Sequence, residues 1–490
     1  MRSAAGVRFT ALRSDVAGAN PTSSSPRQRP GSSGAKKGGS APLRPLRPAP
    51  STSIASRSNP PQAATHRFPT PLVELALALV HTAGISLRGT VRVVETVSHA
   101  LKLGWDTPHW TTVRNWLLRF GLARLRSSQQ QADDWVFLVD HSVQIGKEKC
   151  LVGLGIRQAE YQRLNRCLSL EDMTLLHLEV MPRSTKEDVE RSMKRLCQTV
   201  GVPRGVVNDN GADLAGGIRL LKKHYPQVRA ISDCKHKAAC LLKKRLHKDA
   251  HWKEFQKHLG RTKTEIQQTE LAFLAPPSQR SKARYMNVDK LVVWAEKVLA
   301  VLDGKLELPT QTKLERREEK LGWLKGYRED LKKWRGWLLT IEGVVRYVGR
   351  HGLTATAAEG LKKELGEQRS ATDLGRELLE FVKEQCQGLN EGERLPGSTE
   401  VVETCMGKLK RLEGEQSKGG FTGLLLGLGA VVGKKDDHSV EELFQQVAIK
   451  EVRAWIKDNL GQTVQAARRR LGMAYRQAQQ NRNQPALTLT

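Results

Sequence analysis

Apolar residues recur at helical spacing in three consecutive segments that begin near residue 70. Ser86 stands at a capping position before the second segment. Thr107 and Pro108 give the third segment a capping residue followed by the proline that often opens a helix. The predicted helices cover Pro71–Ala83, Leu87–His99 and His109–Leu125. The polar side of the last helix consists of Thr111, Thr112, Arg114 and Asn115.

From Asp133 onward the apolar residues form short runs, which is the pattern of strands. The predicted strands cover Trp135–Val143, Cys150–Ile156, Thr174–Met181, Gly205–Asn210 and Val228–Cys234. Helical patterns over Ser184–Thr199 and Ala212–His224 separate the last three strands. Three strands, a helix, a strand, a helix and a strand follow each other in the order of the RNase H-like fold. We therefore predict an α/β core with a mixed five-stranded sheet.

Composition divides the chain into six segments. The first is dense in Pro, Ser, Gly and Arg without apolar periodicity, which predicts a disordered basic tail. The fourth is charged and almost continuously helical in pattern, which predicts a large all-α insertion into the core. The core resumes after the insertion, and a helical basic tail ends the chain. The segments are 1–66, 67–126, 127–246, 247–395, 396–435 and 436–490.

Charge indicates the kind of partner. The chain has 490 residues, with 80 Lys and Arg against 51 Asp and Glu, and its net charge is +29. Such a surplus favours a polyanionic partner, nucleic acid first and an anionic membrane second. We therefore interpret residues 67–126 as a helix-turn-helix domain whose third helix enters the major groove of DNA. An ordinary three-helix bundle, whose surface also carries Arg and Asn, is the alternative.

Several classes of protein are excluded. The longest apolar run, Phe421–Gly433, is shorter than the ~20 residues that a membrane helix needs, and we expect it to be buried against the sheet. Seven cysteines without regular spacing predict no disulfide framework and favour a reducing, cytoplasmic setting. The arginine- and serine-rich N-terminus loosely resembles an organelle transit peptide, which is the alternative. The sequence has no Walker loop, zinc-ligand spacing or Gly-x-Ser-x-Gly motif.

Three acidic residues stand where a carboxylate needs a partner. Asp140 lies inside the apolar strand VFLVDHSV, where burial is costly unless the carboxylate is paired or binds a cation. Asp209 ends the strand GVVNDN, and parallel strands deliver such residues to a cleft. Glu403 lies in a helix that begins at Ser398 or Thr399. In the RNase H-like order the first and fourth strands are neighbours and a later helix crosses the sheet, so we expect the three acids to converge.

Three converging carboxylates repel one another, and a pair of divalent cations relieves that repulsion. Their hard oxygen atoms favour Mg²⁺ or Mn²⁺. Two such ions ~3.5–4 Å apart activate an attacking oxygen and stabilise a leaving oxygen at a phosphodiester. We therefore predict that Asp140, Asp209 and Glu403 are both the catalytic residues and the ligands of two ions.

The segments around these acids resemble the DDE transposases of bacterial insertion sequences. The matching segments are VFLVDHS around Asp140, VVNDNGADL around Asp209, ISDCKHK around Asp233 and STEVVETCMGKLK around Glu403. Related transposases often have Ser-x-x-Ile-Glu-Ser-x-x-Gly-Lys-x-Lys, so the family glutamate falls on Glu403. The resemblance covers about residues 70–435 apart from the insertion. It implies metal-dependent nicking of element ends, attack of the 3′-hydroxyl on target DNA, and a homodimer or higher oligomer.

Two features depart from the family pattern. Glu400 lies one turn before Glu403 on nearly the same helix face and is the alternative third ligand. The Gly-Lys-x-Lys spacing favours Glu403. The insertion between Asp209 and Glu403 is large, and its role is unassigned. Its tryptophans could stack on an extruded base, although their helical spacing favours a core.

Further residues are candidates for DNA contact. Lys408 and Lys410 follow the glutamate, and we expect them near the scissile phosphate, with a solvated basic face as the alternative. His236, beside Asp233, is either a DNA contact or a structural residue. Together these features predict a DNA transposase of the bacterial cytoplasm, associated with the nucleoid, that binds terminal inverted repeats and target DNA. The alternatives are an inactive or repurposed transposase that only binds DNA, and an RNase H-like nuclease without strand transfer.

Overall fold

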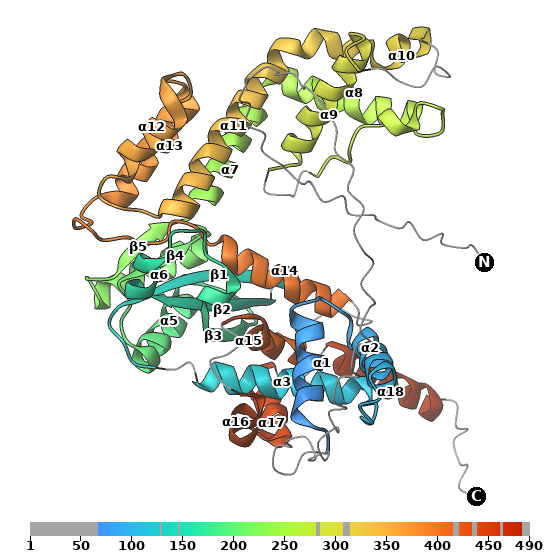
Figure 1. Cartoon of the computed structure of the whole chain (residues 1–490), viewed down its shortest axis with the longest axis vertical. Coiled ribbons are helices and arrows are strands. Elements are labelled where there is room, and N and C mark those ends of the chain that lie inside the picture. Colours follow the sequence, from blue (N-terminus) through green and yellow to red (C-terminus); the bar gives the residue numbers. More distant parts are fainter. Residues whose placement is uncertain are drawn as a thin grey trace, which may run out of the picture. The chain divides into compact units, whose positions relative to one another are not determined.

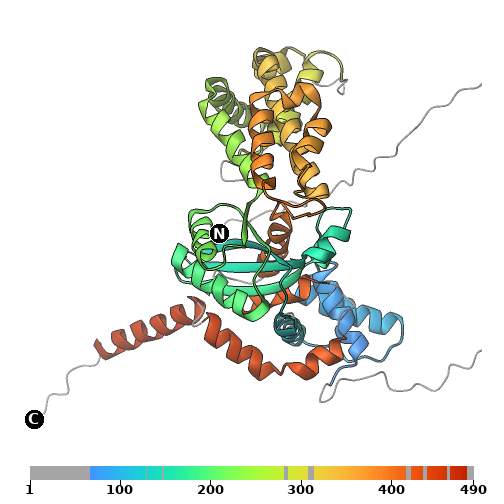
Figure 2. The same cartoon turned by 90° about the vertical axis from the view of Figure 1, so that its left-hand side faces the viewer.

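The computed structural model describes residues 67–127, 130–145, 148–280, 285–306, 314–414, 421–433, 439–460 and 464–482. The tail predicted over residues 1–66 lies outside the described residues. The described chain contains one five-stranded sheet (Figures 1 and 2). In the sequence, helices precede the first strand, lie between later strands and follow the last strand.

All five predicted strands are present. They are β1 (Trp135–Ile145), β2 (Glu148–Arg157), β3 (Thr174–Met181), β4 (Gly205–Asn208) and β5 (Arg229–Ser232). The strand order across the sheet is β3-β2-β1-β4-β5. β1 pairs antiparallel with β2 and parallel with β4, so the sheet is mixed and the first and fourth strands are neighbours as expected. The last two strands are shorter than predicted, and Asp209 and Cys234 lie just beyond their ends.

Short helices connect the strands, and two longer ones cover one face of the sheet. The connecting elements are α4 (Gln158–Arg163), η1 (Leu170–Asp172), α5 (Lys186–Val200) and α6 (Ala212–His224), and α7 (Cys234–Lys248) leads from the last strand into the insertion. Val189 and Met193 of α5 and Ile218 of α6 share a buried cluster with Phe137 and Val206 of the sheet. Thr185 caps α5 in a reciprocal capping box with Asp188, which is why this helix begins where its acidic first turn predicts.

The three N-terminal helices are also present as predicted. They are α1 (Thr70–His81), α2 (Leu87–Ala100) and α3 (Trp110–Ser127), and the side chain of Ser86 caps α2. The C-terminal half of α3 is buried on nearly every side. A side chain at Gly121 would lie 1.7 Å from the carbonyl oxygen of Leu426, so glycine permits a close crossing with the segment after residue 421.

The insertion is all-helical. Its elements are α8 (Ala250–Ile266), η2 (Ala272–Leu274), α9 (Val288–Leu302), α10 (Leu314–Leu321), η3 (Gly322–Tyr327), α11 (Arg328–His351), α12 (Ala357–Ser370) and α13 (Asp373–Cys386). Trp252 and Trp334 are buried, their ring centroids are 4.9 Å apart, and Phe255 packs against both. These two tryptophans are therefore core residues. Where the chain returns to the sheet, Leu395 pairs with Leu353, and the Arg394 guanidinium donates to four backbone carbonyls.

The remaining elements follow the insertion. They are α14 (Glu400–Gly414), η4 (Gly423–Leu426), α15 (Gly427–Val431), α16 (Val440–Gln446), α17 (Ile449–Leu460) and α18 (Val464–Arg482). The apolar run Phe421–Gly433 is buried as predicted, but its main partners are α3 and α14 instead of the sheet. None of the helices that the structure describes combines the length and apolar character needed to cross a lipid bilayer. All seven cysteines are free thiols.

Candidate active site

Asp140 on β1 and Asp209 just after β4 occupy matching positions in the register of two neighbouring strands. The parallel register of β1 and β4 pairs Val136 with Gly205 and Leu138 with Val207. Two residues beyond the last pair, the same register reaches Asp140 and Asp209. Both residues are half-buried, and the turn after β4 is fixed by Asp209, whose Oδ1 accepts a hydrogen bond from the Gly211 backbone at 2.9 Å. The register of the two strands thus brings Asp209 to the level of Asp140.

Asp140 falls on the face of the sheet that α14 covers. Leu138 and Val207 share one buried cluster with Val402 and Leu409 of α14, whereas Phe137 and Val206 belong to the cluster on the other face. Because successive strand residues alternate between faces, Asp140 points to the same side as Leu138. Helix α14 also packs directly against β1. The predicted glutamate therefore lies on the helix that covers Asp140.

The start of α14 is held against the sheet by Asp233. This carboxylate is only 1% exposed, and its Oδ2 accepts hydrogen bonds from the backbone and the hydroxyl of Thr399. Its Oδ1 accepts from the His236 backbone, and the backbone NH of Asp233 donates to the Asn208 carbonyl at 2.8 Å. The same buried carboxylate caps α7 and anchors α14 next to the end of β4, so its role is to position elements.

The two candidate glutamates, Glu400 and Glu403, differ in their contacts with Lys235. Its Nζ lies 2.6 Å from Oε1 of Glu400 and 3.8 Å from Oε2 of Glu403. The side chain of Glu400 is 57% exposed and that of Glu403 is 30% exposed. Glu400 thus forms a close ion pair at the surface, while Glu403 lies deeper. In the sequence, only the position of Lys235 two residues after Asp233 could have indicated this contact.

The donor chemistry of these residues fits hard divalent cations, because all three acids offer carboxylate oxygens. Among the described residues, however, no group of three His, Cys, Asp or Glu side chains is already arranged to hold an ion. The arrangement consists of Asp140 on β1, Asp209 just after the adjacent β4, and Glu403 on α14. The carboxylate of Glu403 lies near Lys235. Completing a site would require Glu403 to exchange this lysine for a cation.

A polar network that the sequence did not predict surrounds His141, the residue after Asp140. Nε2 of His141 is 3.2 Å from Oγ of Ser184, and its Nδ1 is 3.6 Å from Oδ2 of Asp213. Lys149 donates to the same Asp213 oxygen at 2.6 Å. The position of His141 directly after Asp140 was the available signal.

The electrostatics of this network follow from burial. Burial lowers the pKa of His141 to about 4, against the opposing effect of Asp213, so the imidazole is neutral near pH 7. Burial alone would raise the pKa of Asp213, but hydrogen bonds from Lys149 and Ser184 lower it to about 2. Asp213, in the first turn of α6, is therefore an ionised member of a network that links β1, β2 and α6.

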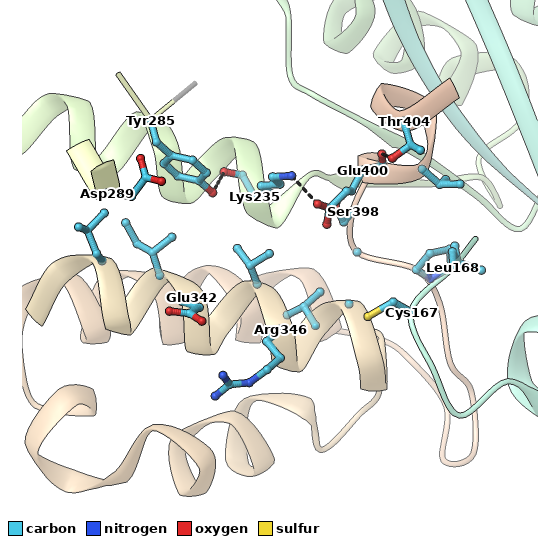
Figure 3. A pocket seen from close by; sticks show the side chains of 18 of the residues that line it. Cys167, Leu168, Lys235, Tyr285, Asp289, Glu342, Arg346, Ser398, Glu400 and Thr404 are labelled. Carbon is cyan, nitrogen blue, oxygen red and sulfur yellow. Dashed lines mark hydrogen bonds and ion pairs between the residues drawn. The ribbon is translucent and has the colours of Figure 1, made fainter. Parts of the chain in front are cut away.

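A pocket of about 650 Å³ opens next to the glutamates. Its walls come from the insertion, the start of α7, the connection between β2 and β3 and the start of α14, from which Glu400 and Thr404 line the pocket but Glu403 does not. Figure 3 shows Lys235 between Tyr285 and Glu400, with the hydroxyl of Tyr285 donating to the Lys235 carbonyl at 3.3 Å. The helical insertion therefore contributes directly to the surroundings of the candidate site.

The predicted DNA-reading residues of α3 have different environments. Thr111 is exposed and lies 2.8 Å from His109 through its hydroxyl, whereas Thr112 and Asn115 are half-buried. Burial lowers the pKa of Arg114, and its Nη2 lies against Gly423, where a Cβ would be 3.3 Å away. Arg114 therefore packs against the segment that covers α3. Entry of this helix into the major groove stays a prediction.

The other predicted DNA contacts, Lys408, Lys410 and His236, also lie in different environments. Lys408 is half-buried, and its Nζ donates to the carbonyl of His81 at 3.4 Å, which ties α14 to the end of α1. Lys410 is exposed and lies seven residues after Glu403, on the same face of α14. His236 is half-buried in the first turn of α7, where its backbone donates to Asp233. A contact between its ring and DNA stays a prediction.

Comparisons with known proteins give little beyond this geometry. No protein-family model matches the sequence, and no curated protein matches it. Among solved structures, the chain is similar to the Drosophila P element transposase strand transfer complex, with 11% identity and a TM-score of 0.26, over 83% of this chain and 84% of that one. A similarity this low carries no argument about the function of this chain.

Proposed function

We propose that the chain is a metal-dependent DNA transposase of the DDE type, with an RNase H-like core, that cuts and joins the ends of a mobile element. The observation that carries the proposal is the register match of Asp140 and Asp209 beneath the helix that bears Glu403. The order of strands, the all-helical insertion and the net charge of +29 support it.

In this proposal, Asp140 and Asp209 hold Mg²⁺ or Mn²⁺ between them, and Glu403 completes one of two ion sites. When bound, the ions supply an activated attacking oxygen and a stabilised leaving oxygen at the phosphodiester. The strands keep the aspartates at a fixed spacing, which such chemistry requires. Asp233 and Thr399 set the position of α14, and Lys410 stands two turns from the glutamate to meet a phosphate. Joining two element ends further implies a dimer or a higher oligomer.

Cleavage of a duplex that carries the element's terminal sequence tests the proposal. With Mg²⁺, we expect nicking by the natural chain and a loss of at least ~100-fold in Asp140→Asn, Asp209→Asn and Glu403→Gln, because each removes a carboxylate ligand. Binding to the same duplex in EDTA should persist in all three variants. Glu400→Gln is the matched control and should cut within about threefold of the natural chain.

Three outcomes would change the conclusion. Normal cutting by Glu403→Gln together with loss of cutting by Glu400→Gln would mean that Glu400, and not Glu403, is the third ligand. Binding without cutting by the natural chain would favour the DNA-binding protein without catalysis. Nicking without any joined product on a supercoiled target plasmid would favour a nuclease.

A further inference from the structure

Helix α18 is an exposed helix near the C-terminal end of the described chain (Figure 1). From residue 468 to residue 480 every side chain is exposed, and only Gly472 is partly covered. Leu471, Met473 and Tyr475 expose 65%, 62% and 66% of their surface. Most of the stability of helices in proteins comes from tertiary packing, and a glycine inside a helix costs about 1 kcal/mol relative to alanine. A partner that covers α18 would therefore stabilise it.

The charge of this segment identifies the chemistry of the partner. No Asp or Glu follows Asp458, whereas the chain from there on contains five arginines. Elsewhere the surface mixes both signs, as on α12 and α13, where exposed Lys and Arg alternate with Glu. A helix whose charged groups are all guanidinium groups is complementary to a polyanion.

The distribution of the arginines around the axis favours a groove over a flat surface. Arg468, Arg469 and Arg470 are consecutive, so they point in three directions about 100° apart. Met473 lies four residues after Arg469 and three before Arg476, so it shares a stripe with both. A helix that lies on a membrane separates its apolar stripe from its cations, and α18 does not.

A nucleic-acid groove meets these conditions. An α-helix with its side chains is roughly 10–12 Å across, and the major groove of B-DNA is roughly 12 Å wide with phosphates along both edges. Exposed Gln477, Gln479 and Gln480 follow the arginines and carry the amide groups that bind base edges and phosphates. A second copy of the same helix is disfavoured, because two chains of arginines repel each other.

We propose that α18 docks in a groove of duplex DNA, with Arg468, Arg469, Arg470 and Arg476 on its phosphates. The inference rests on the proposed function only in taking DNA as the polyanion. It adds a second DNA contact, remote in sequence from α3 and from the acidic residues of the sheet.

Binding measured without metal tests this proposal separately from cutting. Fluorescence anisotropy with a duplex of roughly two helical turns, in EDTA, gives the affinity as salt rises from ~50 to ~200 mM. The test variant replaces the four arginines of α18 with glutamine, which keeps helix propensity nearly unchanged. The control variant is Lys362→Gln, Lys363→Gln, Arg369→Gln and Lys383→Gln, which removes the same charge from exposed positions of α12 and α13.

We expect the slope of log affinity against log salt to be less steep by about 3–4 in the α18 variant, because each phosphate contact contributes about 0.9 to its magnitude. Its affinity at ~150 mM salt should fall at least about tenfold, and that of the control less than about threefold. Equal slopes and affinities in the two variants would overturn the proposal, as would a natural chain that does not bind DNA.

Hydrogen exchange of the natural chain gives an independent answer if the variant misfolds. Amides of residues 468–480 should become protected when the duplex is added. Protection by anionic phospholipid vesicles but not by DNA, or protection that grows with protein concentration alone, would overturn the proposal. If DNA protects α18 and the salt slope responds while no cutting occurs with Mg²⁺, this inference stands and the proposed catalytic function fails.

Discussion

Glu179, on β3, is a half-buried carboxylate surrounded by donors. Ser192 and Arg195 donate to it at 2.5 to 2.7 Å, and His177 lies 3.2 Å away. Burial alone would raise the pKa of Glu179, but hydrogen bonds from His177, Ser192 and Arg195 outweigh that effect and lower the pKa to about 2. The ionised form therefore stabilises the contact between β3 and α5.

The pH dependence follows from this shift. Since the folded pKa lies below the unfolded one, the contribution to stability is present above pH 4.5 and is lost as the pH falls toward 2. At pH 6 we expect Glu179→Gln to lower the free energy of unfolding by roughly 2–3 kcal/mol. Near pH 3 the difference should shrink to less than half. Urea unfolding at both pH values measures it, with Glu384→Gln, an exposed position, as the control. A difference that is the same at both pH values would contradict the role of the ionised carboxylate.

Residues such as these also show what the sequence could predict about the site. Asp140 and Asp209 were recognisable because a carboxylate inside or at the end of an apolar run needs a partner. Lys235 and His141 were not recognised, because a lysine after a strand and a histidine inside one are both common. Their roles depend on Glu400 and Asp213, which lie far away in the sequence.

At the level of elements, the crossing of α3 and α15 depends on two glycines. A Cβ at Gly121 would meet the Leu426 carbonyl at 1.7 Å, and one at Gly429 would meet the Gly121 carbonyl at 2.4 Å. Because backbone atoms cannot move aside as a flexible side chain does, Gly121→Ala should destabilise the chain by about 3 kcal/mol or more. Gly260→Ala, on the exposed side of α8 with nothing near its Cβ, should instead stabilise by about 0.5–1 kcal/mol. Thermal unfolding of the two variants should give shifts of opposite sign, and a Gly121→Ala variant as stable as the natural chain would refute this crossing.

The elements themselves were predictable where local chemistry sets their ends. Ser86 and Thr185 accept the capping hydrogen bonds that their positions indicated. The coverage of α3 by the apolar run after residue 421 was not predictable, because it joins segments about three hundred residues apart. As a result, α3 appeared in the sequence as a helix with a free polar side, whereas Arg114 packs against Gly423.

At the level of the whole molecule, the chain uses its sheet and its insertion to bring remote segments together. The bridge between Leu353 and Leu395 closes the base of the insertion, and Gly397 accepts from the Cys234 backbone as the chain re-enters the core. Through these contacts a helix that begins at residue 400 returns to the sheet, where β1 bears Asp140 and Asp209 follows β4. The proposed reaction requires this return, because no single segment supplies all three acids.

Titration of Mn²⁺ into the chain bound to its end-bearing duplex, followed by electron paramagnetic resonance, tests most directly whether the three acids form one metal site. We predict that the natural chain and Glu400→Gln bind the ion alike, and that Asp140→Asn, Asp209→Asn and Glu403→Gln each weaken binding at least about tenfold. Unchanged Mn²⁺ binding in any of these three variants would contradict the account.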